Sequence, residues 1–454
     1  MVERTGQPQQ AKQGPANQGR ARPKAAERKP RRLGPRPLPL HLSVAMTTWL
    51  SSSVALPFLK AGWRLWRPEL REAGAALQQS LRSVDADSFR RAVSRELAHR
   101  LDDFLAGVQA YRRHPYRRGD IEPKAVWRDG TTRLLDYRRP GAAGAPVLVV
   151  PSLINRGYIL DLNERQSLMR YMADAGLRPF LVDWDRPGAV ERTFTLTDYI
   201  AGRLDAAFDH VVDLTGARPI LLGYCMGGLL ALALAQRRRR EVAGLALLAT
   251  PWDFHADESG TLAAMPAVAH ACSLAIEAAG ELPVDIIQTL FAALDPYLSL
   301  RKFRNFARVD PSAPKAELFV ALEDWLNDGT ALPAAVAREC LFGWYGANTP
   351  ATGQWRVAGR AVDPARVDCP ALVILPAQDR IVPPVSAEVL VNLLPKATAL
   401  RPPLGHIGMI VSSGAERQAW QPLVKWLNLQ QLKRKTPQGL RAKPLTLRAK
   451  GSAR

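Results

Sequence analysis

The run Leu221-Leu222-Gly223-Tyr224-Cys225-Met226-Gly227-Gly228 constrains the fold of this chain more than any other stretch. The apolar pattern predicts a short strand over 219–222 and a helix over 229–235. The glycines around Cys225 are typical of a Gly-x-nucleophile-x-Gly elbow, because bulk beside the nucleophile would collide with the strand or the helix. The run therefore predicts a strand, a sharp turn and a helix, with Cys225 at the turn as the nucleophile.

Cysteine at this turn, where such elbows usually carry serine, changes the expected chemistry. A thiol at a helix N-terminus meets the positive end of the helix dipole and free backbone N–H groups, and both favour the reactive thiolate. The alternative is a glycine-rich turn around a small buried cysteine, since most free cysteines are structural. Because the predicted strand, turn and helix all agree with the elbow, we favour the interpretation of Cys225 as a nucleophile.

Apolar strands alternate with amphipathic helices on both sides of the elbow. That alternation predicts an α/β fold with a mostly parallel sheet and helices on both faces. From about 255 to 361 the alternation stops and helical segments take over, which indicates a cap inserted over the active site. Strands are expected over 147–150, 180–184, 245–249 and 371–375, and helices over 165–175, 200–211, 284–294, 318–326, 334–345 and 420–429.

Charge separates a central body from two basic ends. The net charge of +20 resides mainly in residues 1–37 and 429–454, each of which carries a net charge of +8. Low apolar content predicts that 1–37 is a disordered tail, and 429–454 is predicted to be a basic C-terminal tail. Any contact with a polyanion therefore belongs to these tails, although they could equally be solubilising ends.

Two regions are predicted between the tails: an N-terminal helical or amphipathic segment over 38–125 and a catalytic domain over 126–428. Residues 38–66 are apolar but interrupted by serines, threonines and Pro57, so a transmembrane span is not expected. This stretch either lies on an apolar surface or packs as a helix on the body, and the sequence leaves both readings open. Helical spacing predicts a helix over 85–111, and Asp129-Gly130 predicts a hairpin over 126–137.

Cysteine usage bears on the compartment. The four cysteines are scattered without paired spacing, which argues against a disulfide framework or a zinc site and fits a reducing, cytoplasmic location. No metal or other cofactor is expected. The cysteines are Cys225, Cys272, Cys340 and Cys369.

Two further residues complete a candidate catalytic triad. A thiolate nucleophile needs a base to exchange its proton with and a carboxylate that orients the base. Asp379 follows the predicted strand 371–375, and His406 lies in a loop between two glycines. Each alone could be a solvated carboxylate or a core histidine. Together, in the chain order nucleophile, acid, histidine, they predict the triad Cys225, Asp379 and His406.

The oxyanion of a tetrahedral intermediate needs two N–H donors. The first is expected to be the backbone N–H of Met226, which follows the nucleophile. The second should come from the loop after the strand 147–150, either from Ser152 or from Leu153. Asp161 and Arg156 are close to this loop in sequence and either brace it or form an ordinary surface salt bridge.

Aromatic side chains provide candidates for an acyl pocket under the cap. Trp252 and Tyr345 are the main candidates for contact with substrate, together with Asp161, and aromatic residues at helical spacing are otherwise ordinary core residues. Trp325 and Trp344 are further members of this set.

Four motifs resemble those of polyhydroxyalkanoate synthases in the α/β-hydrolase superfamily, and the chain looks most like the class III catalytic subunit. The resemblance covers roughly 126–428 and implies an α/β-hydrolase fold with a helical cap. It implies that Cys225 is acylated, that His406 is the general base and that Asp379 assists it. The motifs are the runs 153–162, 223–228, 250–254 and 405–408.

The same resemblance implies a reaction. The substrates would be (R)-3-hydroxyacyl-CoA thioesters, the product a polyester, and CoA a leaving group, with no cofactor required. The partners would be the polyester chain and a companion subunit or a second copy of the chain, at the surface of cytoplasmic polyester granules. Two alternatives remain: a cysteine-dependent thioesterase or ester hydrolase, and a non-catalytic granule protein that tethers polymer to nucleic acid.

Overall fold

The computed structural model describes residues 32–432, apart from 63–65, 67, 120–122, 142–143 and 257–260. Residues 1–31 and 433–454, and with them most of the two predicted tails, lie outside the described residues. The described residues from Leu33 onward belong to one compact unit.

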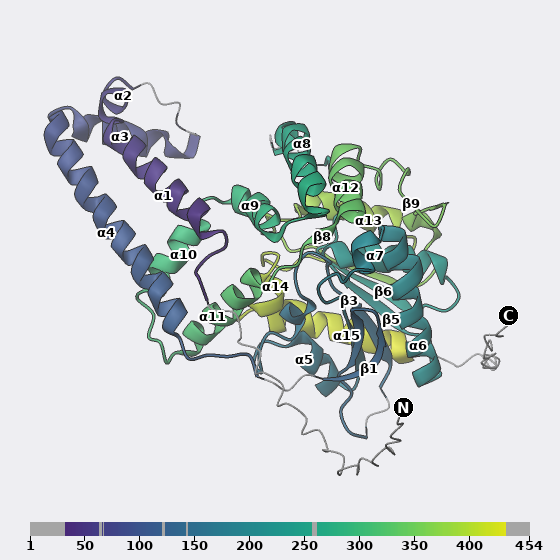
Figure 1. Cartoon of the computed structure of the whole chain (residues 1–454). Helices are drawn as coiled ribbons and strands as arrows, with labels where there is room; N and C mark the ends of the chain where they lie inside the picture. Colours follow the sequence, from purple (N-terminus) through teal and green to yellow (C-terminus); the bar gives the residue numbers. More distant parts are fainter. Residues whose placement is uncertain are drawn as a thin grey trace, which may run out of the picture. The chain divides into compact units, whose positions relative to one another are not determined.

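The centre of this unit is a sheet of eight strands in the order β1-β2-β4-β3-β5-β6-β11-β12. β2 pairs antiparallel with β1 and β4, and the remaining neighbours are parallel. Figure 1 shows β3, β5 and β6 among the strands of this sheet. The expected mostly parallel sheet of an α/β-hydrolase fold is thus confirmed. The strands are β1 Lys124–Asp129, β2 Thr132–Asp136, β3 Pro146–Val150, β4 Arg178–Asp183, β5 Ile220–Tyr224, β6 Gly244–Leu248, β11 Ala371–Ile374 and β12 Ala397–Leu400.

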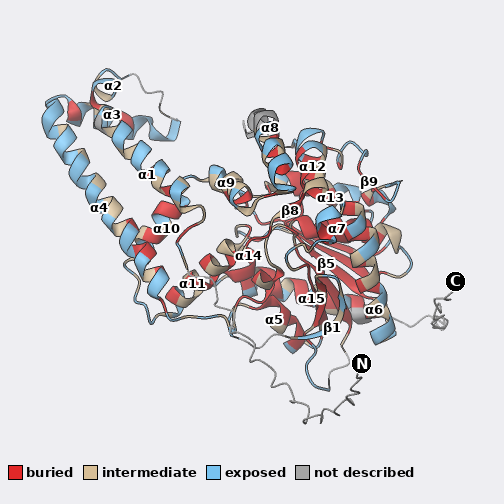
Figure 2. Cartoon of the chain, viewed as in Figure 1, coloured by how far each residue is buried: buried red, intermediate tan, exposed pale blue. Residues whose placement is uncertain are grey.

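Side chains of the central strands alternate between two apolar layers, as the two-residue period of a strand requires. On β3, Leu148 and Val150 pack in one layer, whereas Val147 and Val149 pack in the other. α6, α7 and α13 contribute to the first layer, and α5, α14 and α15 to the second. Figure 2 shows the buried sheet between helices whose outer faces are exposed. The helices are α5 Leu168–Asp174, α6 Asp205–Thr215, α7 Met226–Arg237, α13 Pro384–Leu393, α14 Gly408–Val411 and α15 Gln421–Leu432.

The elbow between β5 and α7 depends on three glycines that admit no side chain. A Cβ atom on Gly223 would lie 2.4 Å from the Cα of Gly228, and one on Gly227 would lie 2.1 Å from the carbonyl oxygen of Val150. Cys225 itself has a positive φ of 55°, which is a strained conformation for a residue with a side chain. The close contact of α7 with the end of β3 is therefore what brings the loop after β3 beside Cys225.

The predicted cap is confirmed as a helical insertion. The expected helix 284–294 is α9, and 318–326 lies within α11, but α8 and α10 had no counterpart among the expected helices. Apolar residues lie all around α8, which gives no clear period, whereas Leu300, Phe303 and Phe306 of α10 do recur at helical spacing and were a usable signal. Past α12, the predicted helix 334–345 continues as a π-helical segment, Glu339–Gly346. The cap helices are α8 Thr261–Ala279, α9 Val284–Leu294, α10 Leu298–Phe306, α11 Pro314–Asn327 and α12 Ala334–Arg338. The cap also holds two short strand pairs. One is β7 Glu281–Leu282 and β8 Leu332–Pro333, and the other is β9 Arg356–Val357 and β10 Arg360–Ala361.

The N-terminal segment is helical and packs on the cap. Phe104, Val108 and Tyr111 of α4 form an apolar cluster with Phe303 of α10 and Val320 of α11. Asp85 caps α4 by accepting the N–H groups of residues 87 and 88, which confirms the helix expected over 85–111. The helices of this segment are α1 Leu38–Ser53, α2 Leu56–Lys60, α3 Arg71–Leu81 and α4 Ala86–Arg113.

Burial of one face of α1 decides between the two interpretations of the apolar stretch 38–66, which were packing on the body and lying on an apolar surface. His41 and Ala45 of α1 are buried, so this helix packs on the protein, although Met46 and Leu50 on its other face are exposed. In the part of the chain that the structure describes, no helix is long and apolar enough to cross a membrane.

The predicted tail boundaries require two corrections. Gly34 and Pro35 are buried, and Arg36 pairs with Asp285 of α9, so the prediction of disorder is wrong for 33–37. The composition averaged over residues 1–37 does not reveal that 33–37 are ordered, because the residues that they contact lie in distant elements. At the other end, α15 continues to Leu432, three residues past the predicted helix end at 429.

The glycine contacts predict a sharp effect on stability. In Gly227→Ala the new methyl group would overlap the Val150 carbonyl group, and neither backbone can move without disturbing the elbow. We expect a loss of at least about 2 kcal/mol in the free energy of unfolding, measured by chemical denaturation. The matched control is Gly202→Ala, since a Cβ atom at Gly202 meets nothing within 4 Å; its effect should stay within about 1 kcal/mol. Equal stability of the two variants would contradict this account.

Candidate active site

The structure brings the three predicted catalytic side chains together at the carboxyl ends of the parallel strands. The Nδ1 atom of His406 lies 2.7 Å from Oδ2 of Asp379, and Cys225 is close enough to the same imidazole ring for its charge to raise the pKa of the ring. The other carboxylate oxygen of Asp379 accepts the backbone N–H groups of Ile381 and Val382 at 2.8 and 2.9 Å. Hydrogen bonds therefore hold both oxygen atoms of the Asp379 carboxylate. Because the carboxylate occupies Nδ1 of His406, Nε2 is the ring nitrogen that can face the Cys225 sulfur atom.

Burial and charge compete at His406. Burial lowers the pKa of this imidazole, but the charges of Cys225 and Asp379 and their hydrogen bonds to the ring outweigh burial and raise the pKa to about 10. A thiolate at Cys225 thus holds a proton on His406 at neutral pH. A cysteine beside an imidazole that a carboxylate orients is the arrangement that activates a cysteine nucleophile.

Tyr224, the residue before the nucleophile, supports the histidine. Its ring lies 5.2 Å from the imidazole of His406, and its hydroxyl group donates to the His406 carbonyl oxygen at 3.3 Å. Complete burial raises the pKa of Tyr224 well above its usual value, and the charges of Cys225 and Asp379 act in the same direction. The hydroxyl group therefore stays protonated and remains a donor to the loop that carries His406.

Cys225 and His406 line a cavity of about 340 Å³ beneath the cap. Phe291 of α9 and Trp325 of α11 are among its lining side chains. This volume is at the lower end of the range for small-molecule sites, which are typically apolar with a few polar groups. The lining includes exposed Leu294 and Leu298 and buried His41.

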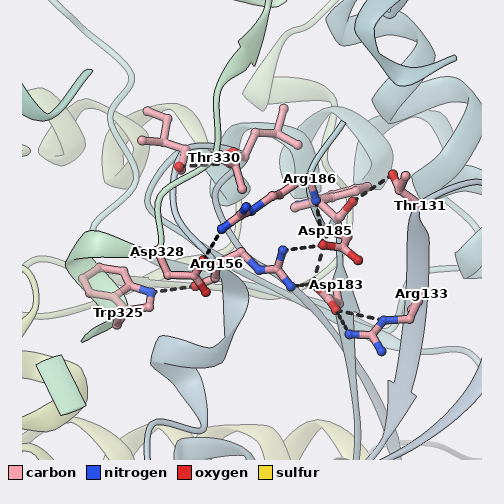
Figure 3. Close-up of polar contacts among 12 residues, drawn as sticks. Thr131, Arg133, Arg156, Asp183, Asp185, Arg186, Trp325, Asp328 and Thr330 are labelled. Atoms are coloured by element: carbon pink, nitrogen blue, oxygen red, sulfur yellow. Dashed lines mark hydrogen bonds and ion pairs between the residues drawn. The ribbon is translucent and has the colours of Figure 1, made fainter. Parts of the chain in front are cut away.

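The loop after β3 is held in place by Arg156, as Figure 3 shows. The Arg156 guanidinium group hydrogen-bonds Asp185, and Asp183 lies 3.9 Å away. From the cap, the indole N–H of Trp325 donates to the Arg156 carbonyl oxygen at 2.7 Å. The predicted brace at Arg156 is thus present, and it joins the loop both to the end of β4 and to α11.

The predicted oxyanion donors lie in suitable places, but their role stays a prediction. Met226 is the first residue of α7, so its N–H belongs to the first helical turn, where backbone donors have no intrahelical acceptor. Ser152 lines the cavity beside Cys225. Leu153 is buried, and its carbonyl oxygen accepts the Thr330 hydroxyl group at 2.8 Å. Both Ser152 and Leu153 remain candidates for the second donor.

Asp161 is not brought to the cavity. It is 1% exposed, accepts the guanidinium group of Arg170 at 2.8 Å and the hydroxyl group of Tyr137 at 3.0 Å, and lies 3.6 Å from Arg118. The expected substrate contact of Asp161 is therefore wrong: the carboxylate is a structural anchor. The sequence placed it near the loop but gave no sign of the three partners, which come from distant segments.

The two expected aromatic contacts with substrate differ in their positions. Trp252 is buried and packs against Trp355, with ring centroids 6.4 Å apart, so it belongs to the core beneath the cap. The Tyr345 ring contacts Phe254 edge to face, and burial of its hydroxyl group, together with the charge of Cys225, raises the pKa of Tyr345. Neither residue lines the cavity, whereas Trp325 does, and the substrate contact of Tyr345 stays a prediction.

Sequence reasoning missed several functional candidates that the structure reveals. Tyr224 lies inside the elbow motif, where an aromatic residue beside the nucleophile was a usable signal. Lys302 and Glu323 of the cap form an ion pair in the cavity wall, in which Glu323 is buried and Lys302 partly exposed. A charged residue in an amphipathic helix gives no sequence signal of such a pair. Among the described residues, no group of three or more His, Cys, Asp and Glu side chains could hold a metal ion.

The coupling between the sulfur and the imidazole predicts a titration shift. In Cys225→Ser the hydroxyl group is neutral, so His406 loses a favourable charge while the burial that opposes its protonation remains. We expect His406 to titrate at least about 1 pH unit lower than in the wild type, followed by NMR of isotope-labelled histidine. Cys369→Ser, at a buried cysteine that is not a lining residue of the cavity, is the control. An unchanged titration in Cys225→Ser would refute the ion pair.

Comparison with known proteins identifies the family. Residues 145–413 match the model of the alpha/beta hydrolase fold family. The poly(3-hydroxyalkanoate) polymerase subunit PhaC of Allochromatium vinosum is 31% identical over 317 residues, which cover 68% of this chain and 89% of that protein. The PhaC subunit of Thiocystis violacea is 30% identical over 68% of this chain and 88% of the relative. The PhaC subunit of Synechocystis is 31% identical over 63% of this chain and 78% of the relative. The chain therefore belongs to the poly(3-hydroxyalkanoate) polymerase PhaC family within the α/β-hydrolase fold.

Proposed function

We propose that this chain is an acyltransferase that polymerises (R)-3-hydroxyacyl-CoA thioesters into a polyester through a covalent thioester on Cys225. The observation that carries the proposal is the group of Cys225, His406 and Asp379 at the elbow, with 2.7 Å between Nδ1 of His406 and Oδ2 of Asp379. The polymerase names of the relatives support the choice of substrate. Met226, with Ser152 or Leu153, would supply the oxyanion donors.

In the first step, the thiolate of Cys225 attacks the carbonyl carbon of the CoA thioester. A new sulfur–carbon bond forms to Cys225 while the carbon–sulfur bond to CoA breaks. The departing CoA thiolate takes the proton from Nε2 of His406, which becomes neutral. This transfer is favourable because acylation removes the thiolate charge that had held the proton on the imidazole.

In the second step, neutral His406 acts as the general base. Its Nε2 atom accepts the proton of the 3-hydroxyl group of a second substrate as the hydroxyl oxygen attacks the acyl carbon on Cys225. An ester bond forms and the cysteine thiolate leaves, so the thiolate–imidazolium pair is restored. Asp379 holds the ring orientation throughout and stabilises the imidazolium ion.

A thioesterase would share the first step and differ only in the nucleophile of the second. The aromatic side chains in the cavity lining, Phe291 and Trp325, favour an alcohol over water because they disfavour solvent. A thioester on cysteine is also a good acyl donor to an alcohol. Product analysis decides between the two: insoluble polyester supports the polymerase, whereas free 3-hydroxy acid as the main product supports the hydrolase.

Loss of the nucleophile gives the direct test of the covalent route. In Cys225→Ala the release of CoA from (R)-3-hydroxybutyryl-CoA should fall by at least roughly 1000-fold, because the acyl acceptor is absent. Cys369→Ala is the control and should keep the wild-type rate, since Cys369 is buried and is not a lining residue of the cavity. Thiol release is measured continuously with purified protein. Retained turnover in Cys225→Ala would eliminate the covalent mechanism.

Partners and location follow from the same proposal. A polyester product accumulates as a separate phase, so the enzyme would work in the cytoplasm at the surface of polyester granules. A companion subunit or a second copy of the chain would be a further partner. Assay of the purified chain alone establishes whether a second subunit is needed, since polymer formation by the single chain makes one unnecessary.

The basic ends would contact a polyanion such as DNA. Removal of 1–31 and 433–454 should abolish most of the salt-sensitive binding of the protein to DNA, because neutralised phosphates release counterions in proportion to the bound cations. Affinity is measured by fluorescence anisotropy at several salt concentrations. An unchanged affinity and salt dependence would show that the tails are not the binding elements.

A further inference from the structure

The cap is hydrogen-bonded to the loop after β3, from which the second oxyanion donor is expected. The Thr330 hydroxyl group lies 2.8 Å from the carbonyl oxygen of Leu153 and 3.1 Å from that of Ile154. The backbone N–H of Thr330 also donates to the Ile154 carbonyl oxygen at 3.1 Å. The indole N–H of Trp325 donates to the carbonyl oxygen of Arg156 at 2.7 Å, as Figure 3 shows. Three backbone carbonyl groups of the loop are therefore held by residues of the cap.

Gly329 lets the cap chain run directly beside the loop. It forms an antiparallel bridge with Asn155. A Cβ atom on Gly329 would lie 2.9 Å from Cγ1 of Val284 and 3.3 Å from the side-chain oxygen of Asn155. Thr330, the next residue, is 3% exposed, so little solvent competes for its hydrogen bonds. The loop and the cap are thus paired through their backbones at a buried position.

The direction of these carbonyl groups determines where the N–H groups of the loop point. A trans peptide group holds its carbonyl oxygen and its N–H on opposite sides of the chain. The carbonyl group of Leu153 shares a peptide group with the N–H of Ile154, and that N–H donates to Oγ of Ser152 at 3.1 Å. Ile154 is therefore not available as an oxyanion donor, and Ser152 and Leu153 remain. Thr330 holds the two peptide groups that directly follow these candidate donors.

We propose that Thr330 is a positioning residue for acyl transfer, which holds the loop after β3 so that its oxyanion donor faces the substrate carbonyl oxygen at Cys225. This inference rests on the proposed function. When a thiolate attacks a thioester, the carbonyl oxygen becomes negatively charged, and donors that are already in place stabilise this charge best. Thr330 is not among the residues that line the cavity, so it acts through the loop and not by touching substrate.

The test removes the Thr330 hydroxyl group and keeps the shape of the side chain. In Thr330→Val, kcat for CoA release from (R)-3-hydroxybutyryl-CoA should fall at least about 10-fold, while KM stays within about 3-fold of the wild type. Thr330→Ser restores the hydroxyl group and should return kcat to within about 3-fold of the wild type. Thermal unfolding verifies that both variants fold. An unchanged kcat in Thr330→Val would overturn the assignment.

The matched control removes a threonine hydroxyl group elsewhere. The Thr215 hydroxyl group donates to the Val211 carbonyl oxygen at 2.6 Å. Thr215 ends α6, before the amino end of β5, whereas Cys225 follows the carboxyl end of that strand. Thr215→Val should therefore keep the wild-type kcat.

Alkylation separates loss of the oxyanion donor from general damage to the nucleophile. The reaction of Cys225 with iodoacetamide needs the thiolate but forms no oxyanion. Its rate in Thr330→Val should therefore equal that of the wild type. Alkylation that slows in parallel with kcat would show that Thr330 supports the nucleophile and would overturn a role in the oxyanion loop.

Hydrogen exchange judges the positioning role independently of the product. The backbone N–H groups of 152–156 should exchange faster in Thr330→Val than in the wild type, measured by mass spectrometry. Exchange at the wild-type rate would overturn the inference even if polymer forms. Free 3-hydroxy acid as the main product would instead refute the polymerase. The positioning role would stand in that case if kcat still fell in Thr330→Val, since hydrolysis and polymerisation pass through the same oxyanion.

Discussion

The contact between Gly227 and the carbonyl oxygen of Val150 is the constraint on which the site depends. A missing side chain at this point lets α7 start against the end of β3, so that the loop after β3 reaches the nucleophile. The same turn forces a positive φ on Cys225. Strain at this single residue is maintained by the packing of two parallel strands and a helix around it, since each of these elements is buried. The position of the sulfur atom is thus set by the sheet and not by the loop alone.

Local patterns were sufficient to predict the sheet, the elbow and the triad. The central strands are buried on both faces and read as continuous apolar runs, and the triad residues follow strands whose carboxyl ends meet at one edge. Asp161 shows where such reasoning stops. Its partners Arg118, Tyr137 and Arg170 are up to 43 residues away, and hydrogen bonding at that separation has no periodic signature in the sequence.

The substrate pocket could not be predicted because its walls come from three separate segments. The N-terminal segment contributes His41, the cap contributes Trp325, and the hydrolase core contributes Ser152. Aromatic residues of the cap are of two kinds: some fill the core, as Trp344 does, and others, such as Trp325, line the cavity. Composition cannot separate these kinds, because both need the same apolar character and differ only in which side of a helix meets the cavity. The fold is thus encoded locally, whereas the pocket is a property of the assembled layers.

His406 lines the cavity and also carries the proton in the proposed reaction. Burial by itself would favour a neutral His406, whereas the charge of Cys225, followed by the hydrogen bond and the charge of Asp379, raises the pKa of the ring. In the proposed mechanism, acylation of Cys225 removes the largest of these raising contributions, so the same residue changes from an acid that protonates the leaving thiolate to a base that accepts a proton from a hydroxyl group. No movement of the backbone is required for this change. Asp379, fixed by two backbone N–H groups, keeps the ring in position for both steps. The choice between alcohol and water as the second nucleophile then depends on which of them the cavity admits, and this makes the lining of the cavity, more than the triad, the determinant of the product.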